Sequence, residues 1–444
     1  MRKMKDSGIE WIGKIPEDWN IVRIKFTLEG HYAGEWGSNK EDNEADCICV
    51  RVADFDYPRL EVKFHDDMTI RSYTQKTIDK SSLKRGDILL EKSGGGEVTP
   101  VGRSVIFDSD NTMMFANFIE CLRPLETYDS HFLNYWLSSS YVNGFSKRNI
   151  KQTTGIQNLD ITAFLSEKIA LPNKEKQSLI ANYLDKKCAE IDALIEAKEK
   201  ANALLKEQRQ SIIYEAVTKG LNPNVPMKDS GIEWIGKIPK NWNITRIKYT
   251  SILKGRIGWQ GLKSDEYINE GPYLITGVDF VDGRIDWNNC FHISKQRYDE
   301  APEIHIFEGD LLITKDGTIG KLAIAENCPK NVSLNSGVLL IRNKKNGDYL
   351  NRYLYYVLQS DVFWKWFRLS QNGNSTIIHL YQEQFSNFRY SLPSIEEQKN
   401  IISHLDNSCD KLDKLISTHN ITIEKLKEYR KSIIFEAVTG KVEI

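Results

Sequence analysis

Two stretches of the chain place apolar residues at alternating spacings of four and three over more than four heptads. One stretch begins at Leu184 and the other at Leu405. The apolar seam positions are Leu184, Ile191, Ile195, Leu205 and Ile212 in the first stretch, and Leu405, Leu412, Ile416, Ile423, Leu426 and Ile433 in the second. A repeat of this length predicts two long helices that form a coiled coil. The two stretches offer each other as partners, and we expect them to pair antiparallel.

Polar residues interrupt this seam at several positions, including Asn202, Arg209, His419 and Arg430. Such residues lower the stability of a coiled coil but can fix the register of its helices. We therefore interpret His419 as a seam residue and not as a metal ligand. Antiparallel pairing in a duplicated chain would place two globular domains at opposite ends of the helices, related by an approximate twofold axis.

Shorter apolar runs bounded by turn residues lie on both sides of the first long stretch and predict strands. They are residues 46–55, 86–94 and 103–110 before it, and residues 271–280, 309–320 and 337–343 after it. An aromatic helical pattern follows each set, and a polar loop follows each helix. The predicted helices are at 131–145 and 350–367, and the predicted loops at 146–160 and 368–380. The shared order predicts two copies of one mixed α/β domain.

The order is shared because the chain is an internal duplication of about 220 residues. Residues 4–25 recur at 227–248 with only three differences, and the segments that open and close the two long helices recur as well. Between these frames, residues 26–170 and 249–391 have similar lengths but largely different sequences. The predicted segments are a first globular domain at 1–170, a central long helix at 171–222, a second globular domain at 223–391 and a C-terminal long helix at 392–444.

Composition adds limits to this picture. A chain of 444 residues has room for two cores, and no apolar run approaches the roughly 20 residues that cross a membrane. The seven cysteines form no CxxC pair, which is typical of a reduced, cytoplasmic protein. The net charge is −1, so any nucleic-acid site has to be a local patch on a neutral body.

Known catalytic patterns are mostly absent. Residues 316–321 (DGTIGK) resemble a phosphate-binding loop but lack its four-residue spacer and its final Ser or Thr, so we expect a tight glycine turn. Asp56, Glu61 and Lys63 imitate the spacing of a metal-dependent nuclease site, but only in the first unit, and an exposed strand face explains them better. The sequence therefore predicts a chain without catalytic activity and without a bound metal.

Each domain carries loops with side chains that can read nucleic acid. Arg and Lys recognise guanine edges, Asn and Gln recognise adenine edges, and glycine allows close approach of the backbone. In the first domain the candidates are Lys92, Ser93, Gly94, Lys147, Arg148, Lys151, Gln152, Thr154 and Gln157. In the second domain they are Arg256, Trp259, Gln260, Lys315, Thr318, Arg368, Gln371, Asn372 and Asn374. Polar loops of this kind are also common as simple exposed turns.

The repeated frame MKDSGIEWIGKIPxxW, the strands that begin GDIL and GDLL, and the helix endings SIIYEAVT and SIIFEAVT resemble the specificity subunit of type I restriction-modification systems. The resemblance spans essentially the whole chain, twice and in the same order. Two departures are minor: Lys176-Gln177 stands where the family has Glu-Gln, and Lys219-Gly220 replaces a simple Thr-Gly ending. Residues 256–262 (RIGWQGL) resemble one recurrent class of recognition domain, which favours Arg256, Trp259 and Gln260 as DNA contacts.

The resemblance implies two target-recognition domains that each read half of a split sequence in double-stranded DNA. The two long helices would set the spacer and dock two modification subunits, and restriction subunits would join them. Those partners would bind S-adenosylmethionine, ATP and Mg²⁺ and methylate adenine, whereas this chain would bind no cofactor. The residues alone leave an alternative, a noncatalytic coiled-coil scaffold that spaces two protein ligands.

Overall fold

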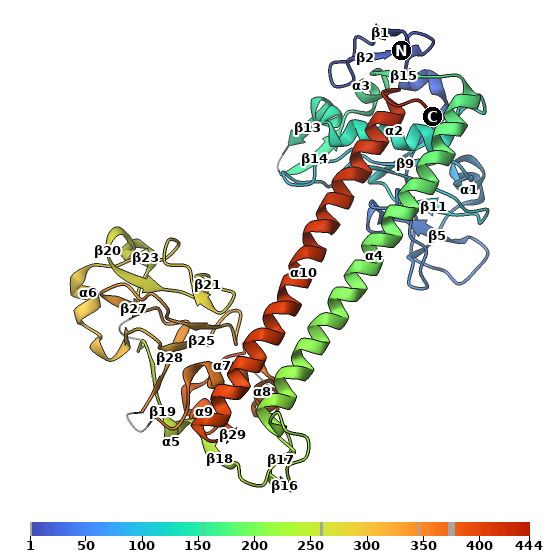
Figure 1. The fold of residues 1–444 in the computed structure, drawn as a ribbon. Coiled ribbons are helices and arrows are strands. Elements are labelled where there is room, and N and C mark those ends of the chain that lie inside the picture. The colour runs from blue at the N-terminus through green and yellow to red at the C-terminus, as the bar shows by residue number, and fades with distance from the viewer. Residues whose placement is uncertain (1, 154, 258–260, 345–346, 372–377) are drawn as a thin grey trace. The chain divides into compact units, whose positions relative to one another are not determined.

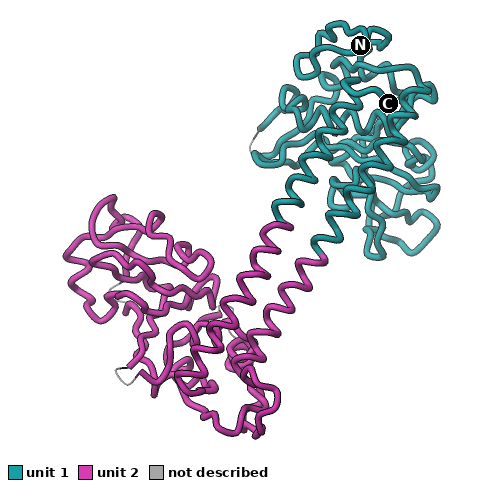
Figure 2. Tube along the Cα trace, in the orientation of Figure 1, with its two compact units in different colours: residues 1–199, 420–444 teal, residues 200–419 magenta. Residues whose placement is uncertain are grey.

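The computed structural model describes residues 2–153, 155–257, 261–344, 347–371 and 378–444 (Figure 1). The chain forms two compact units, coloured separately in Figure 2. Unit 1 contains residues 1–199 and 420–444, and unit 2 contains residues 200–419. Each unit takes part of both long helices, so this division differs from the four segments expected from the sequence.

Unit 1 is built on a six-stranded mixed sheet. Its strand order is β4 (Leu28–Ala33), β12 (Ile119–Pro124), β9 (Ile88–Glu91), β10 (Ser104–Ile106), β7 (Glu61–Val62) and β6 (Phe55–Asp56). Strand β9 is buried on both faces, as its continuous apolar run predicts. Ile88 and Leu90 pack on the side of helix α2 (Ser130–Val142), and Leu89 packs on the opposite side with Phe107 and Phe115.

A smaller three-stranded sheet completes the core on the Leu89 side of the six-stranded sheet. Its order is β11 (Met114–Phe115), β5 (Asp46–Val50) and β8 (Ile70–Ser72), followed in the chain by helix α1 (Gln75–Ser81). Thr74 caps α1 by accepting a hydrogen bond from the Thr77 backbone.

Unit 2 repeats this plan with different residues. Its six-stranded sheet has the order β19 (Ser251–Gly255), β28 (Val338–Asn343), β25 (Leu311–Thr314), β26 (Leu322–Ile324), β22 (Arg284–Ile285) and β21 (Phe280–Val281). A four-stranded sheet has the order β23 (Phe291–His292), β20 (Ile268–Ile275), β27 (Val332–Leu334) and β24 (His305–Ile306). Leu311 and Ile313 face one core and Leu312 faces the other, as in β9. The prediction of two mixed α/β domains is confirmed.

The repeated frame folds the same way in each unit. The first hairpin is β1 (Met4–Asp6) with β2 (Lys14–Pro16), repeated as β16 (Met227–Asp229) with β17 (Lys237–Pro239). Next, β3 (Asn20–Arg23) pairs with β15 (Lys168–Leu171), and β18 (Asn243–Arg246) pairs with β29 (Arg389–Leu392). Trp19 and Trp242 are fully buried. They anchor each frame to its core.

Both long helices form as predicted: α4 spans Lys174–Lys219 and α10 spans Ile395–Val438. A glycine with positive φ follows each helix, Gly220 directly after α4 and Gly440 two residues after α10, and each packs against the buried tryptophan of its unit. A Cβ atom at Gly440 would lie 3.0 Å from the Trp19 ring and closer still to Pro16. The extra Lys219 moves the glycine of α4 one residue further along the chain, yet Gly220 still packs against the buried Trp242.

The helices run antiparallel within each unit. In unit 1, Asp192 of α4 lies 3.1 Å from the Arg430 guanidinium of α10. In unit 2, Asn202 meets His419 at 2.9 Å. All eleven predicted seam residues are buried or half-buried: Leu184, Ile191, Ile195, Leu205, Ile212, Leu405, Leu412, Ile416, Ile423, Leu426 and Ile433. The polar seam residues therefore find partners on the opposite helix.

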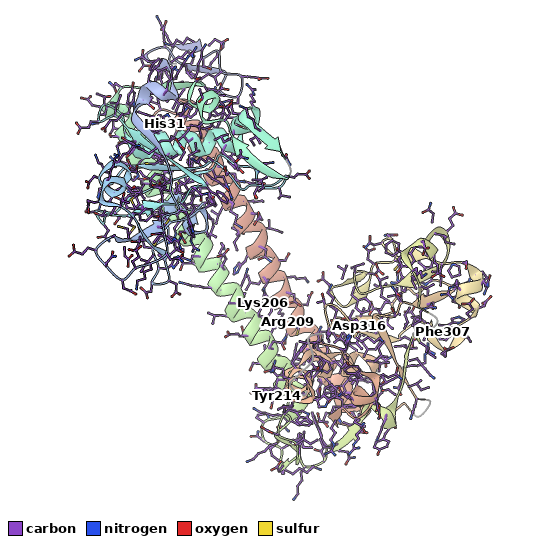
Figure 3. All side chains as sticks on the ribbon, turned by 180° about the vertical axis from the view of Figure 1, so that it is seen from behind. His31, Lys206, Arg209, Tyr214, Phe307 and Asp316 are labelled. Carbon is purple, nitrogen blue, oxygen red and sulfur yellow. The ribbon has the colours of Figure 1, made fainter. Side chains whose placement is uncertain are left out.

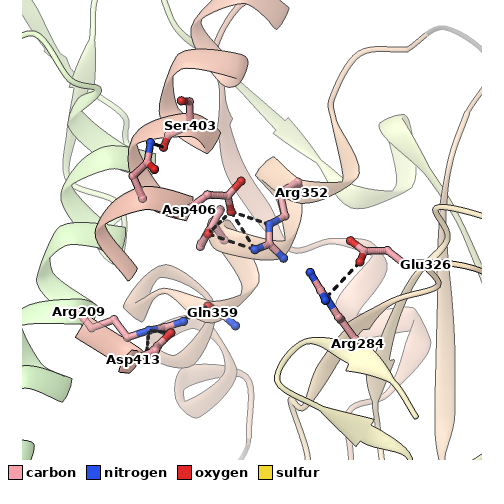
Figure 4. Close-up of polar contacts among 10 residues, drawn as sticks. Arg209, Arg284, Glu326, Arg352, Gln359, Ser403, Asp406 and Asp413 are labelled. Carbon is pink, nitrogen blue, oxygen red and sulfur yellow. Dashed lines mark hydrogen bonds and ion pairs between the residues drawn. The ribbon is translucent and has the colours of Figure 1, made fainter. Parts of the chain in front are cut away.

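Figure 4 shows how unit 2 attaches its α/β part to the helices. Arg209 of α4 contacts Asp413 of α10 and Gln359 of α7 (Asn351–Gln359). Arg352 of α7 donates to Asp406 of α10 at 2.9 Å. These contacts tie three helices together at one edge of the unit.

Two elements differ from the sequence expectations. The predicted helix at 350–367 is two helices, α7 and α8 (Asp361–Ser370), because Ser360 caps α8 by accepting a hydrogen bond from Val362 N. The predicted loop at 146–160 contains a hairpin of β13 (Ile150–Thr153) and β14 (Ile156–Leu159). Its strands are largely polar, so the alternating apolar signal of a strand is weak there.

Candidate nucleic-acid interface

The two candidate loops of unit 1 lie together in space. The turn after β9 joins the β13–β14 hairpin through the backbone: Leu159 N donates to Lys92 O at 2.8 Å, and Gly94 N donates to Gln157 O at 3.1 Å. Ser93 Oγ adds a bond of 2.6 Å to Asn158 Oδ1. Residues 65 positions apart therefore form one continuous surface.

The hairpin presents some candidates and buries another. Lys151 pairs with Asn158 across the hairpin, and Gln152 pairs with Gln157. Lys151 and Gln152 are exposed, whereas Gln157 is buried and its Oε1 accepts a hydrogen bond from Val101 N at 3.3 Å. Gln157 thus holds the loop in place in this conformation. Thr154 lies outside the described residues.

Carboxylates neutralise most candidate cations of unit 1. Lys92 Nζ lies 2.9 Å from Glu120, Lys151 Nζ lies 2.6 Å from Asp160, and Arg148 pairs with Glu10. The bond from Lys151 lowers the pKa of Asp160. Among the described residues, Lys147 is exposed and forms no ion pair. The surface is therefore rich in hydrogen-bonding groups but has little excess positive charge.

Sequence reasoning missed His31 and Glu120 at this surface. His31 of β4 is labelled in Figure 3. Its Nδ1 lies 2.7 Å from Glu120 Oε1, and Glu120 also binds Lys92. The polar positions of β4 alternate, which was a signal for an exposed strand face at His31. The contact with Glu120 depends on the pairing of strands 89 residues apart, so no local sequence pattern indicates it.

Unit 2 builds the same surface with other residues. Leu380 N donates to Lys315 O at 3.0 Å, matching the bond between Leu159 and Lys92. Lys315 N donates to Gly337 O at 2.9 Å, matching a bond from Lys92 N to Phe118 O. The backbone scaffold is shared, and the side chains that it displays differ.

The neighbourhood of Lys315 contains Asp316, the first residue of the DGTIGK turn, and a histidine that the sequence did not single out. Asp316, labelled in Figure 3, lies 2.5 Å from His379 Nδ1, and Lys315 Nζ lies 3.9 Å from Asp316. Gln371 donates to His379 O at 3.3 Å. These contacts tie the Lys315 turn to the segment that follows α8.

Of the remaining candidates of unit 2, two are exposed and four lie outside the described residues, apart from Arg256. Thr318 and Arg368 are exposed, and Arg368 forms no ion pair with any described residue. Thr318 sits in the predicted glycine turn, where its carbonyl accepts a hydrogen bond from Thr314 Oγ1. Four candidates, Trp259, Gln260, Asn372 and Asn374, lie outside the described residues.

Arg256 follows β19 and is only 3 % exposed. Its guanidinium donates to Leu334 O at 2.9 Å and to Ser333 Oγ at 3.0 Å, and burial lowers its pKa. This geometry favours a structural role for Arg256, because a buried arginine that bonds the protein is not free to meet a base. Its contact with DNA stays a prediction.

The nuclease-like residues Asp56 and Glu61 belong to neighbouring strands of unit 1. Asp56 and Glu61 face each other across the β6–β7 hairpin and line an open groove of about 1220 Å³ in unit 1. Burial raises the pKa of Glu61. Over the described ranges, no group of three His, Cys, Asp or Glu side chains is placed to hold a metal ion. In the same part of the chain, no helix is long and apolar enough to cross a membrane.

Comparison with known proteins adds to this geometry. Residues 34–205 and 240–427 match the family model described as the type I restriction modification DNA specificity domain. The putative type I restriction enzyme MjaX specificity subunit of Methanocaldococcus jannaschii is 25 % identical over 98 % of this chain and 96 % of its own length. The EcoBI specificity subunit of Escherichia coli is 25 % identical over 62 % of this chain and 58 % of its own length.

Solved structures share the fold. A chain from a type I R-M system superposes with a TM-score of 0.70 at 16 % identity, covering 96 % of this chain and 99 % of that one. The HsdS subunit of Thermoanaerobacter tengcongensis gives a TM-score of 0.53 at 16 % identity, covering 96 % and 98 %. The family model matches most of the chain, in both repeats. The chain therefore belongs to the family of type I restriction-modification DNA specificity subunits.

Proposed function

We propose that each unit reads one half of a bipartite, asymmetric sequence in double-stranded DNA. The supporting observation is the shared backbone scaffold: the same hydrogen bonds hold the Lys92 turn in unit 1 and the Lys315 turn in unit 2, yet the displayed side chains differ. Two surfaces with the same backbone but different side chains are suited to reading two different half-sites. A duplicated scaffold for identical ligands would have no need of different side chains.

The chain acts without catalysis of its own. It docks two modification subunits, which bind S-adenosylmethionine and methylate adenine, and restriction subunits, which use ATP and Mg²⁺. We call the turn after β9 together with the β13–β14 hairpin the Lys92 surface. The near-neutral net charge supports a dependence on partner subunits, because the ion pairs of the Lys92 surface leave few cations for phosphate contacts. Basic surfaces of the partners would then supply most of the salt-dependent binding.

Methylation mapping tests this proposal. The chain is expressed with the methyltransferase subunit of its own system in cells that lack other adenine methylation, and methylated adenines are mapped across the genome. We expect one split sequence with a fixed spacer. Residues 249–391 are then replaced by the equivalent region of a relative with another specificity, which should change one half-site and leave the other unchanged.

Two results would contradict the proposal. One is methylation that does not depend on the chain. The other is a change of both half-sites after replacement of one region. A chain that binds the methyltransferase but never directs it to DNA would favour the protein scaffold instead.

A further inference from the structure

A cross-strand pair of like charges occurs at the same place in both units. In unit 1, Arg23 of β3 lies directly opposite Lys168 of β15. In unit 2, Arg246 of β18 lies directly opposite Arg389 of β29. Opposed residues of an antiparallel pair project from the same face, and like charges there destabilise a sheet. Because both units keep this destabilising pair, we look for its role outside the sheet.

A lysine stacked on an exposed aromatic ring follows each pair. Lys25 Nζ lies 5.2 Å from the centre of the Phe26 ring, and Lys248 Nζ lies 5.4 Å from the centre of the Tyr249 ring. Phe26 is 60 % exposed and Tyr249 is 62 % exposed. We call the group of Arg23, Lys25, Phe26 and Lys168 in unit 1, and of Arg246, Lys248, Tyr249 and Arg389 in unit 2, the frame patch.

The cations of the frame patch have few side-chain partners within the part of the chain that the structure describes. Over the described residues, none of the six forms an ion pair, and the one side-chain hydrogen bond among them joins Lys248 to Asn387 at 2.9 Å. Arg23, Lys25 and Lys168 are exposed, whereas Arg246, Lys248 and Arg389 are half-buried. This contrasts with the Lys92 surface, where most cations are neutralised.

The frame patch is separate from the surface proposed to read DNA. The patch of unit 1 precedes β4, and the reading turn lies at the far end of that strand, because Glu120 pairs with both Ala33 and Leu90. Six residues at about 3.3 Å each put roughly 20 Å between the two ends. Unit 2 has the same layout, since Leu339 of β28 pairs with both Gly255 of β19 and Ile313 of β25. Figure 1 labels these three strands.

We propose that the frame patch of each unit docks an acidic protein surface with a recess for the aromatic ring, and that this surface belongs to the modification subunit. The inference rests on the proposed function, which supplies one such partner for each unit. Four cationic or aromatic side chains recur in both units while the reading surfaces differ, as a site for two identical partners requires. Exposed aromatic residues are typical anchors of protein interfaces, and the surrounding cations select an acidic partner.

The test replaces one member of each like-charge pair, in the double variant Lys168→Glu and Arg389→Glu. Each new glutamate faces an arginine, so the sheet gains an attractive pair and the melting temperature should not fall. Binding to the separately purified methyltransferase subunit should weaken about tenfold or more. The matched control is Lys76→Glu with Lys330→Glu, which makes the same charge change at exposed lysines away from the patch.

A second variant removes the aromatic rings without touching a core, because Phe26 and Tyr249 are both mostly exposed. Phe26→Ser with Tyr249→Ser should also weaken the complex while the melting temperature holds. Unchanged affinity of both double variants would overturn the frame patch. So would intact partner binding together with weaker DNA binding by the assembled complex, which would assign the patch to phosphates. If the wild-type chain did not bind the methyltransferase at all, the proposed function itself would fail.

Discussion

At the residue scale, the two units differ in one pair that responds to pH. His131 of α2 lies 3.6 Å from Asp185 of α4, and Tyr135 donates to the same carboxylate at 2.8 Å. The equivalent pair in unit 2 is Arg352 with Asp406, where Tyr356 donates in the same way. Arginine keeps its charge at every physiological pH, whereas histidine does not.

This difference predicts that one contact of unit 1 weakens as the pH rises. Asp185 raises the pKa of His131, so the folded state holds the proton more tightly than the unfolded state. The contribution is complete below the ordinary histidine pKa of about 6.5 and is lost as the pH passes the raised value. The pair is partly exposed, so the melting temperature should fall by less than about 4 °C between pH 6 and 8.

Differential scanning calorimetry of His131→Arg checks this expectation. The variant should lose that part of the pH dependence, and Arg352→His should introduce a similar one in unit 2. An unchanged slope in His131→Arg would show that the pair does not contribute.

Among the described residues, Lys147 and Arg368 are the exposed cationic candidates without an ion pair, and they belong to different units. Lys147→Ala and Arg368→Ala should each weaken binding at one half-site, by about 1–3 kcal/mol for a base contact. Competition between duplexes with single base changes, using the complex with the methyltransferase, measures this. Equal loss on all sequences would identify phosphate contacts. Arg256→Ala serves as the contrast, because we expect it to lower the stability of unit 2.

At the element scale, regular spacing of apolar residues predicted the helices and strands that have an apolar face. The long helices, the central strands and their order along the chain followed from spacing in the sequence. The break at Ser360 was missed because apolar residues continue on both sides of the cap, and the β13–β14 hairpin was missed because its strands are polar. The contact of the Lys92 turn with Asn158 spans 65 residues, and local pattern has no access to such pairing.

The entrance of each long helix depends on one buried glutamine. Gln398 donates to Pro393 O and Asp348 O and accepts from Leu350 N, and Gln177 donates to Pro172 O and accepts from Asp129 N. These bonds give Gln177 a structural role at the helix entrance, in which its neighbour Lys176 takes no part.

Gln398→Ala should therefore lower the free energy of unfolding by about 1–3 kcal/mol, because it leaves buried backbone groups without partners. Urea unfolding measures the change. Gln208→Ala, at an exposed position inside α4, should have little effect. Equal effects of the two substitutions would mean that the glutamine bonds do not stabilise the helix entrance.

At the scale of the whole molecule, the proposed function assigns a length to the helices. Helices α4 and α10 each continue without interruption from one unit into the other. If the helices set the distance between the half-sites, each helical residue contributes a rise of about 1.5 Å to that distance. Four extra residues in each helix, inserted after Ala197 and after Lys425, should add about 6 Å. Duplex DNA rises about 3.4 Å per base pair, so the preferred spacer should grow by one or two base pairs while both half-sites stay the same. Methylation mapping of the insertion variant measures the spacer directly. An active variant with the original spacer would show that the helices do not set the distance.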